Sequence, residues 1–249
     1  MRRLTTIGVI VGAALCAAMP AYPVPPDAGS ALTPFEAVYT ITRGRLRIGE
    51  MSMRLEPPVE GVWRYRSASE ASGLVAMFTD VSIVEQSTFR VEDGLPVPLS
   101  HDYRMPGSEK NRDFSLAFDW VEREARGVVR GEPAAEPLAP GAVDRHTATI
   151  AMAAATAGAR AFPFEFVMID RARTRRYDAT LQGVQTLETA AGRIETVRAL
   201  LVRVGEPERQ FRFWFAPELG HLPVRIQSVD DDGKTVTLQL LRYTLHADS

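Results

Sequence analysis

Apolar and polar side chains alternate with a period of two along most of this chain. The clearest runs cover residues 35–42, 63–66, 81–86 and 114–119. Successive side chains of a strand point to opposite faces, so each run places one set of side chains in a core and the other toward water. In the third run, Glu85 shares its face with Val81 and Ile83. The pattern predicts strands with one buried and one wetter face, as antiparallel sheets have.

Turn residues separate these runs, at Arg43-Gly44, Asp93-Gly94, Met105-Pro106-Gly107, Ala191-Gly192 and Asp231-Asp232-Gly233. Short strands at this spacing, with no helices between them, favour a meandering antiparallel sheet in which hairpins connect successive strands. The predicted fold is therefore mainly β: a curved antiparallel sheet, barrel or half-barrel, with one main α-helix.

Three segments interrupt the strand pattern. Residues 72–78 (SGLVAMF) form an apolar run long enough for a helical turn, and the proline-rich residues 131–142 are expected to form a loop. After that loop, Asp144 can accept hydrogen bonds from the first backbone N–H groups of a helix that ends near Gly158. This helix is rich in alanine, with Ile150 and Met152 as its only large apolar residues, and small side chains suit close packing on a sheet.

The organisation expected from these elements is simple. Residues 1–21 are a signal peptide, residues 22–34 a proline-rich tether, and residues 35–247 a single β-rich domain. The two strand-rich halves are expected to form one continuous curved sheet with the helix on or inside it. Two separate domains are the weaker alternative, because neither half has a complete set of core strands with a covering element.

The first residues predict export. Arg2 and Arg3 precede an apolar run from Leu4 to Ala18, and small residues follow around Ala21. A basic start, an apolar stretch of this length and a small-residue cleavage site are typical of a signal peptide. The run is shorter than the roughly 18 apolar residues of a membrane-spanning helix. We therefore expect a periplasmic or secreted protein with no transmembrane segment after cleavage.

Charge and cysteine content narrow the function classes. Loss of Arg2 and Arg3 with the signal leaves 27 of the 29 basic residues against 31 acidic ones, a net charge of −4. A chain this close to neutral does not have the excess of basic residues that is typical of nucleic-acid-binding proteins. The only cysteine, Cys16, lies in the apolar run behind Leu15, where a lipoprotein signal has a small residue, so we do not expect lipidation. The mature chain would then have neither a disulfide nor a thiol nucleophile.

No catalytic or metal-binding set stands out. The four histidines, His101, His146, His221 and His246, have no metal-ligand spacing. A hydrolase triad could be assembled from residues far apart in the sequence, such as Ser100, His221 and Asp230, but nothing selects this set over other choices. Solvated or locally capped histidines are the default interpretation. We therefore predict no enzyme, no metal and no cofactor.

Two clusters are candidates for binding. Arg171, Arg173 and Arg175 would share one face of a strand and form an anion patch for a phosphate, a lipid headgroup or an acidic glycan. The alternative is a polar outer face whose arginines pair with neighbouring acids. We favour it, because charged residues paired on a surface are usually no sign of a binding site. Asp230, Asp231 and Asp232 lack the ligand spacing of a calcium loop, and a turn with solvated acids explains them.

The aromatic residues near the end of the chain form the strongest strand pattern. Phe211, Phe213 and Phe215 lie on one face of a strand over residues 209–216, and Trp214 lies on the other. Either the strand is central and covered on both faces, or its concave face lines an apolar cavity. The sequence leaves both interpretations open.

Three segments resemble the DUF3108 family of exported bacterial envelope proteins: FEAVYTITRGRLRIGEMSM, GVQTLETAAGRIETVRALLV and FRFWFAPELGHLPVRIQ. The resemblance covers roughly residues 35–245 and implies an exported, mainly antiparallel β protein of unknown function. It extends more loosely to the LolA/LolB half-barrels, whose curved sheet and helical lid shelter acyl chains. It implies no catalytic residues. At the family's helix opening, Asp144-Arg145-His146-Thr147 has threonine where serine is typical.

The sequence thus predicts an envelope protein that binds an apolar or amphipathic ligand such as a lipid. The candidate lining residues are Phe211, Phe213, Trp214, Phe215, Ile150 and Met152. The alternative is an interaction module that docks on an envelope protein partner through a sheet edge, without a small ligand. An envelope hydrolase ranks last.

Overall fold

The computed structural model describes residues 32–72, 82–108, 111–229 and 233–246. The predicted signal peptide, most of the predicted tether, nearly all of the SGLVAMF run and the three aspartates 230–232 lie outside the described residues. Among the helices that are described, none is long and apolar enough to cross a membrane.

Fifteen strands form a single sheet in the described part of the chain, and the sheet consists of two meanders. The first meander runs through eight strands in sequence order. These are β1 (Phe35–Arg43), β2 (Leu46–Val59), β3 (Val62–Ala71), β4 (Ser82–Glu92), β5 (Leu95–Arg104), β6 (Phe114–Asp119), β7 (Glu124–Val129) and β8 (Glu132–Pro137).

The second meander contains the remaining seven strands. These are β9 (Val143–Asp144), β10 (Phe164–Ile169), β11 (Thr174–Thr189), β12 (Gly192–Arg203), β13 (Glu206–Ala216), β14 (Leu222–Val229) and β15 (Thr235–Leu245). The two meanders join through the antiparallel pairing of β1 with β15. All neighbours are antiparallel except β9 and β10. The sheet ends at β8 and β9 and does not close into a barrel, which confirms the predicted curved antiparallel fold.

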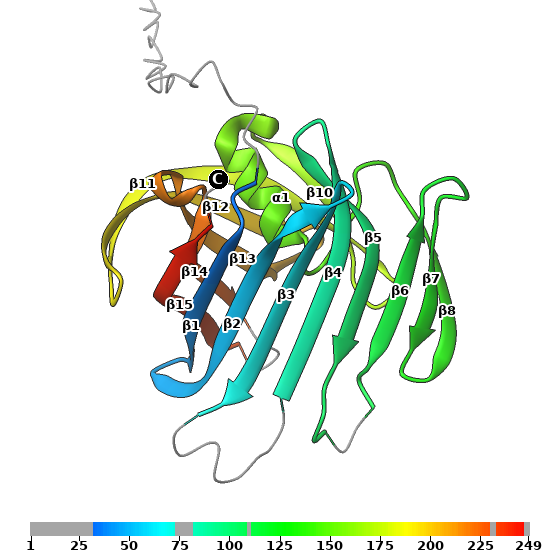
Figure 1. Cartoon of the computed structure of the whole chain (residues 1–249), viewed down its shortest axis with the longest axis horizontal. Helices are drawn as coiled ribbons and strands as arrows, with labels where there is room; N and C mark the ends of the chain where they lie inside the picture. Colours follow the sequence, from blue (N-terminus) through cyan, green and yellow to red (C-terminus); the bar gives the residue numbers. More distant parts are fainter. Residues whose placement is uncertain (1–31, 73–81, 109–110, 230–232, 247–249) are drawn as a thin grey trace, which may run out of the picture.

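The predicted helix lies between the two halves of the sheet (Figure 1). Helix α1 (Ala148–Ala154) continues into the π-helical turn η2 (Ala155–Ala159). Just before α1, the Asp144 carboxylate accepts the backbone N–H groups of His146 and Thr147, both at 2.8 Å. The short 3-10 helix η3 (Pro217–Leu219) connects β13 to β14.

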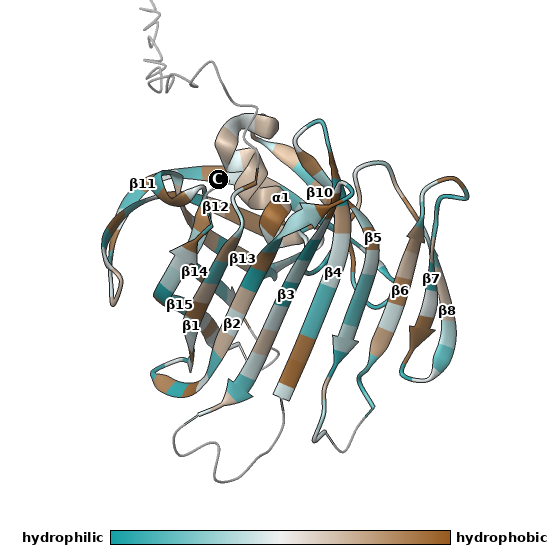
Figure 2. Cartoon of the chain, viewed as in Figure 1, coloured by the Kyte–Doolittle hydropathy of each residue, from teal (hydrophilic) through white to brown (hydrophobic). Residues whose placement is uncertain are grey.

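The strand periodicity holds where it was clearest. Phe35, Ala37 and Tyr39 are buried on one face of β1, and Phe114, Leu116 and Phe118 are buried on one face of β6. Apolar and polar bands accordingly alternate along the strands of the first meander (Figure 2).

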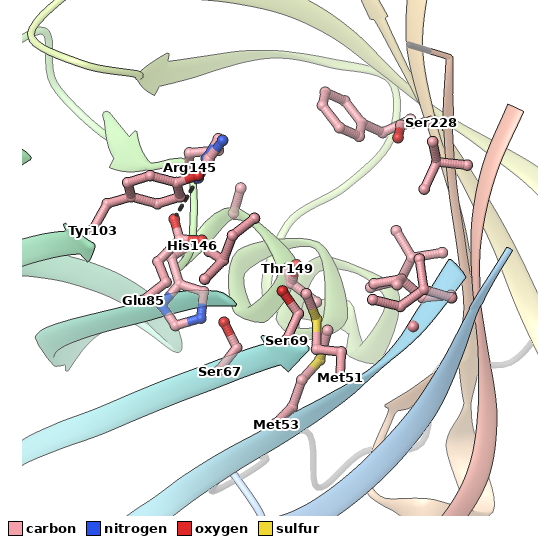
Figure 3. A pocket seen from close by; sticks show the side chains of 18 of the residues that line it. Met51, Met53, Ser67, Ser69, Glu85, Tyr103, Arg145, His146, Thr149 and Ser228 are labelled. Carbon is pink, nitrogen blue, oxygen red and sulfur yellow. Dashed lines mark hydrogen bonds and ion pairs between the residues drawn. The ribbon is translucent and has the colours of Figure 1, made fainter. Parts of the chain in front are cut away.

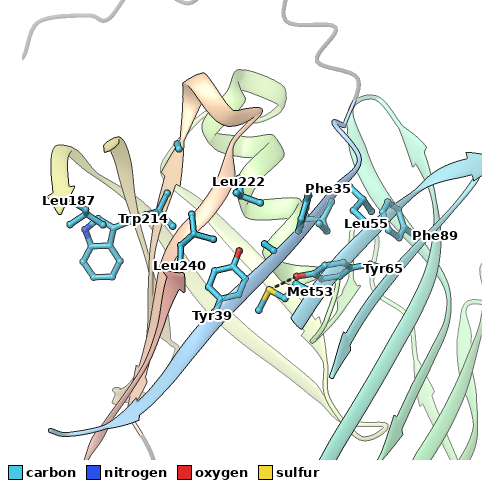
Figure 4. Close-up of a cluster of buried hydrophobic side chains, with 14 residues drawn as sticks. Phe35, Tyr39, Met53, Leu55, Tyr65, Phe89, Leu187, Trp214, Leu222 and Leu240 are labelled. Atoms are coloured by element: carbon cyan, nitrogen blue, oxygen red, sulfur yellow. Dashed lines mark hydrogen bonds between the residues drawn. The ribbon is translucent and has the colours of Figure 1, made fainter. Parts of the chain in front are cut away.

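One large core cluster joins the two meanders (Figure 4). Tyr39 of β1 is fully buried there, and its hydroxyl donates to the carbonyl oxygen of Pro223 in β14 at 2.8 Å. Trp214 belongs to this cluster, whereas Phe213 and Phe215 belong to a second cluster under α1. Both faces of β13 are therefore covered over its last four residues, Phe213 to Ala216.

The predicted loop over residues 131–142 is wrong in its first half, because β8 occupies Glu132–Pro137 and pairs with β7. A central strand hydrogen-bonds to a neighbour on each side, and proline has no N–H group to donate to either neighbour. β8 has a neighbour on one side only, so Pro133 and Pro137 are tolerated in it. Sequence reasoning treated these prolines as strand breakers and missed the edge strand.

Candidate ligand-binding site

A cavity of about 570 Å³ lies between the two meanders, beside the N-terminal part of α1. Most of its wall is apolar and comes from both halves of the sheet. The larger apolar lining side chains are Ile41, Ile48, Met51, Met53, Ile83, Met168, Phe211, Phe213, Ile226, Val236 and Leu238.

The cavity also has a polar part, where β3, β4 and β5 meet the segment that leads into α1 (Figure 3). Tyr65, Ser67 and Ser69 face it from β3, and Glu85 and Tyr103 from β4 and β5. Arg145, His146 and Thr149 complete it from the helix side. The cavity is thus amphipathic, apolar over most of its length and polar beside the start of α1.

Strand register explains why these polar groups meet. Ser67 lies opposite Glu85 in the β3–β4 pair, and Glu85 lies opposite Tyr103 in the β4–β5 pair. In the next inward rung, Ser87 lies opposite His101. Directly opposite residues have Cβ atoms only about 5 Å apart, so alternate inward residues of three strands form one compact polar patch.

Glu85 accepts hydrogen bonds from two side chains. The Nε2–H of His101 donates to Glu85 Oε1 at 2.8 Å, and Arg145 donates to the same oxygen at 2.9 Å. Burial opposes the ionisation of Glu85, but Arg145 and His101 hold the pKa of this carboxyl well below its usual value. Arg145 also lies over the ring of Tyr103, 5.3 Å from its centroid.

Asp144 organises the second half of the polar cluster. Besides two backbone N–H groups, it accepts the Ser87 hydroxyl at 2.9 Å and the Thr147 hydroxyl at 2.7 Å. Its Oδ1 lies 3.7 Å from Nδ1 of His101. Burial lowers the pKa of His101, but Asp144 and Glu85 outweigh burial and raise that pKa above its ordinary value.

His146 is buried against Tyr65, with parallel rings whose centroids are 4.2 Å apart. Its Nδ1 lies 3.3 Å from Ser87 Oγ. Burial lowers the pKa of His146 to about 4, so the ring is neutral at pH 7. His146 Nε2 is buried and has no hydrogen-bond partner among the described residues.

Ser87, His146 and Asp144 do not form a nucleophilic triad. A triad serine donates to the histidine, which in turn donates to the carboxylate. Here the serine donates to the carboxylate, and Ser87 is not among the residues that line the cavity. In the described part of the chain, no group of three or more His, Cys, Asp or Glu residues is arranged to hold a metal ion.

The default interpretation of solvated histidines is wrong for His101 and His146, which are both buried. The residues of the distant triad have unrelated neighbours: Ser100 Oγ lies 2.7 Å from Thr88 Oγ1, and His221 Nδ1 lies 3.0 Å from Thr156 Oγ1. Asp230 lies outside the described residues.

The six candidate lining residues divide into two groups. Phe211 and Phe213 line the cavity. Phe215 and Met152 are buried in the cluster under α1, and Ile150 and Trp214 in the cluster that joins the meanders. Trp214 points away from the cavity because it is one residue out of phase with Phe213 and Phe215. Ile150 and Met152 follow the stretch of α1 that lines the cavity, at Ala148 and Thr149.

The three arginines of the predicted anion patch do not share a strand face. Arg171 and Ala172 form the two-residue turn between β10 and β11, with φ of 51° and 52°, and Asp170 and Arg173 exchange backbone hydrogen bonds around it. Only Arg175 lies in β11. Arg171 instead lies 3.7 Å from Asp170, as an ion pair.

Sequence reasoning missed the polar cluster, although two signals were present. Glu85 stands on the inward row of its strand, next to Ile83, where an unpaired carboxylate would be costly. His101 likewise precedes the inward Tyr103 by two residues. A charged residue on an apolar row indicates a buried partner, but the partners come from residues 144–146, which the alternation does not place.

Fold and site together define an open antiparallel half-barrel with an internal amphipathic cavity. The family model of DUF3108, described as a protein of unknown function, matches residues 38–240, and the chain belongs to this family. That confirms the resemblance found in the sequence. None of the curated proteins matches the chain in sequence.

One solved structure supports the fold. The chain is similar to the beta-barrel-like protein of domain of unknown function DUF1849 from Brucella abortus, with a TM-score of 0.56 and 9% identity over 87% of this chain and 99% of that one. A further match is the hypothetical lipoprotein YmcC from Escherichia coli, with a TM-score of 0.30 and 9% identity over 86% of each chain. At such identities, the first likeness speaks for the fold alone.

Proposed function

We propose that this protein is an exported envelope protein that binds an amphiphile in the cavity between its two meanders. The observation that carries the proposal is the division of one cavity into a long apolar wall and a compact polar end. An amphiphile with a single apolar chain matches both parts at once. The basic, apolar and small-residue segments at residues 1–21 support export.

The size of the cavity is adequate for such a ligand. Its volume of about 570 Å³ falls inside the range of roughly 300–1,000 Å³ that is typical of small-molecule sites. Each methylene that leaves water contributes about 0.8 kcal/mol. Ten methylenes would contribute about 8 kcal/mol before the entropic cost of binding. Micromolar affinity corresponds to a net value of about 8 kcal/mol, so further methylenes and contacts at the polar end must offset that cost.

The first experiment is native mass spectrometry of the mature protein purified from an envelope fraction, followed by extraction with organic solvent. A stoichiometric adduct of lipid size that extraction removes would support the proposal and identify the ligand class. A clean mass of the protein alone, from gently handled samples, would favour the docking module, and a pull-down from envelope extract would follow.

A blocking variant tests whether this cavity is the site. Thr149 is partly exposed and lines the cavity from α1, so Thr149→Trp places an indole in the space of the ligand. Thr186 of β11 is exposed and does not line the cavity, which makes Thr186→Trp a matched control. We expect Thr149→Trp to abolish binding of a fluorescent fatty-acid probe and Thr186→Trp to retain it. Equal binding by both variants would place the site elsewhere.

A further inference from the structure

The hydrogen positions in the polar cluster follow from the acceptors around Ser87. A carboxylate oxygen has no hydrogen to donate, and Asp144 Oδ1 already accepts two backbone N–H groups. The 2.9 Å contact between Ser87 Oγ and this oxygen therefore uses the only hydrogen of the serine hydroxyl.

The state of His146 follows from that assignment. Ser87 Oγ can then only accept at its 3.3 Å contact with His146 Nδ1, so the ring carries its hydrogen on Nδ1. The ring is neutral, since burial holds the pKa of His146 near 4. Nε2 is left with a bare lone pair, and it is buried without a partner among the described residues.

The ring that carries this lone pair belongs to the wall of the cavity. His146 is one of the lining residues, and its imidazole lies beside Ser67 at the polar end (Figure 3). A buried acceptor without a donor costs free energy, and buried polar groups are nearly always hydrogen-bonded. A ligand group that supplies an N–H or O–H here would remove that cost.

The charged groups around the polar end already have partners. Arg145 and His101 both donate to Glu85, and the Asp144 carboxylate accepts from Ser87, Thr147 and two backbone N–H groups. An ionic head would lose its hydration and find no unpaired group of opposite charge among these residues, so an uncharged head is favoured.

We propose that the amphiphile has an uncharged head with a hydroxyl or amide N–H that donates to Nε2 of His146. This inference rests on the proposed function and adds the chemistry of the head group. A monoacylglycerol has the required chemistry, whereas a fatty-acid methyl ester has acceptors only.

The test compares three ligands with the same palmitoyl chain on the purified mature protein: monopalmitoylglycerol, methyl palmitate and palmitoyl lysophosphatidic acid. Displacement of a fluorescent probe gives the three dissociation constants. We expect monopalmitoylglycerol to bind about tenfold more tightly than methyl palmitate, which corresponds to ~1.4 kcal/mol. We also expect it to bind more tightly than the lysophosphatidic acid.

Equal affinity for the alcohol and the methyl ester would overturn the inference while leaving amphiphile binding intact. Tightest binding of the lysophosphatidic acid would overturn the uncharged head. If none of the three ligands binds, the proposed function fails as well.

A substitution then assigns the preference to one atom. In His146→Asn, the side-chain amide can still donate to Ser87 from the position of Nδ1 but has no group at the position of Nε2. We expect this variant to lose the tenfold preference while its affinity for methyl palmitate stays within about twofold. A purely structural role would weaken both ligands equally and overturn the assignment. His221→Asn makes the same change at a histidine outside the cavity, and should keep the preference.

Discussion

The acceptor role of Asp144 leads to a quantitative prediction about stability. Its carboxylate accepts four hydrogen bonds, from the hydroxyls of Ser87 and Thr147 and the backbone N–H groups of His146 and Thr147. The three residues that supply these donors, Ser87, His146 and Thr147, are all buried. Asp144→Ala therefore leaves these donors in a place that water does not reach.

The magnitude follows from that count. The Thr147 hydroxyl retains a 3.4 Å contact with the Asp144 carbonyl oxygen, and the Ser87 hydroxyl can donate to His146 Nδ1 once the neutral ring carries its hydrogen on Nε2 instead. Two backbone N–H groups remain without any acceptor, at about 1–3 kcal/mol each. We expect Asp144→Ala to lower the free energy of unfolding by about 4 kcal/mol, a large part of the 5–15 kcal/mol typical of a domain. Asp144→Asn keeps one acceptor oxygen and should cost about half as much.

Urea unfolding at pH 7, followed by tryptophan fluorescence, measures both losses. The chain has a matched control, because Asp119 also accepts two backbone N–H groups, those of Val121 and Glu122, in an exposed turn. Water replaces the lost acceptor there, so Asp119→Ala should cost less than about 1 kcal/mol. Equal losses for Asp144→Ala and Asp119→Ala would refute the reasoning.

Three further predictions follow from the cavity and the sheet. The pKa of His146 is lowered to about 4, below that of an unfolded histidine, so the unfolded chain binds more protons between pH 6.5 and 4 and stability falls as pH falls. The stability difference between the native protein and His146→Asn should shrink by about 3 kcal/mol from pH 7 to pH 4, and a pH-independent difference in urea titrations would contradict this. For saturated alcohols that bind the cavity, each added pair of methylenes should tighten binding about tenfold until the cavity is full, and flat affinity across the series in probe displacement would exclude the apolar wall as the chain site. A Cβ on Gly127 of β7 would lie 1.9 Å from the carbonyl oxygen of Ser115, so Gly127→Ala should cost about 2 kcal/mol in urea unfolding, and an unchanged midpoint would show that the backbone moves freely there.

The sequence alone determined the strands with clear alternation, their inward faces and the class of fold, because alternation is a local property of each strand. It missed the edge strand β8, which has no such alternation. It indicated that Phe211 and Phe213 share a face and that Glu85 lies on an inward row. It also placed a helix after residue 144, although Asp144 accepts the N–H groups of His146 and Thr147 just before α1 and does not cap its first turn. Each of these features depends on residues a few positions apart.

Only the tertiary structure decided which inward side chains line a cavity and which fill a core. Phe213 and Phe215 have the same pattern in the sequence, yet only Phe213 reaches the cavity, because α1 covers the sheet over part of its length. The polar cluster likewise needed the register of β3, β4 and β5 and the return of residues 144–146 to the same place. Glu85 and Arg145 are 60 residues apart, and a contact at that separation is set by packing of the whole sheet and not by any local pattern.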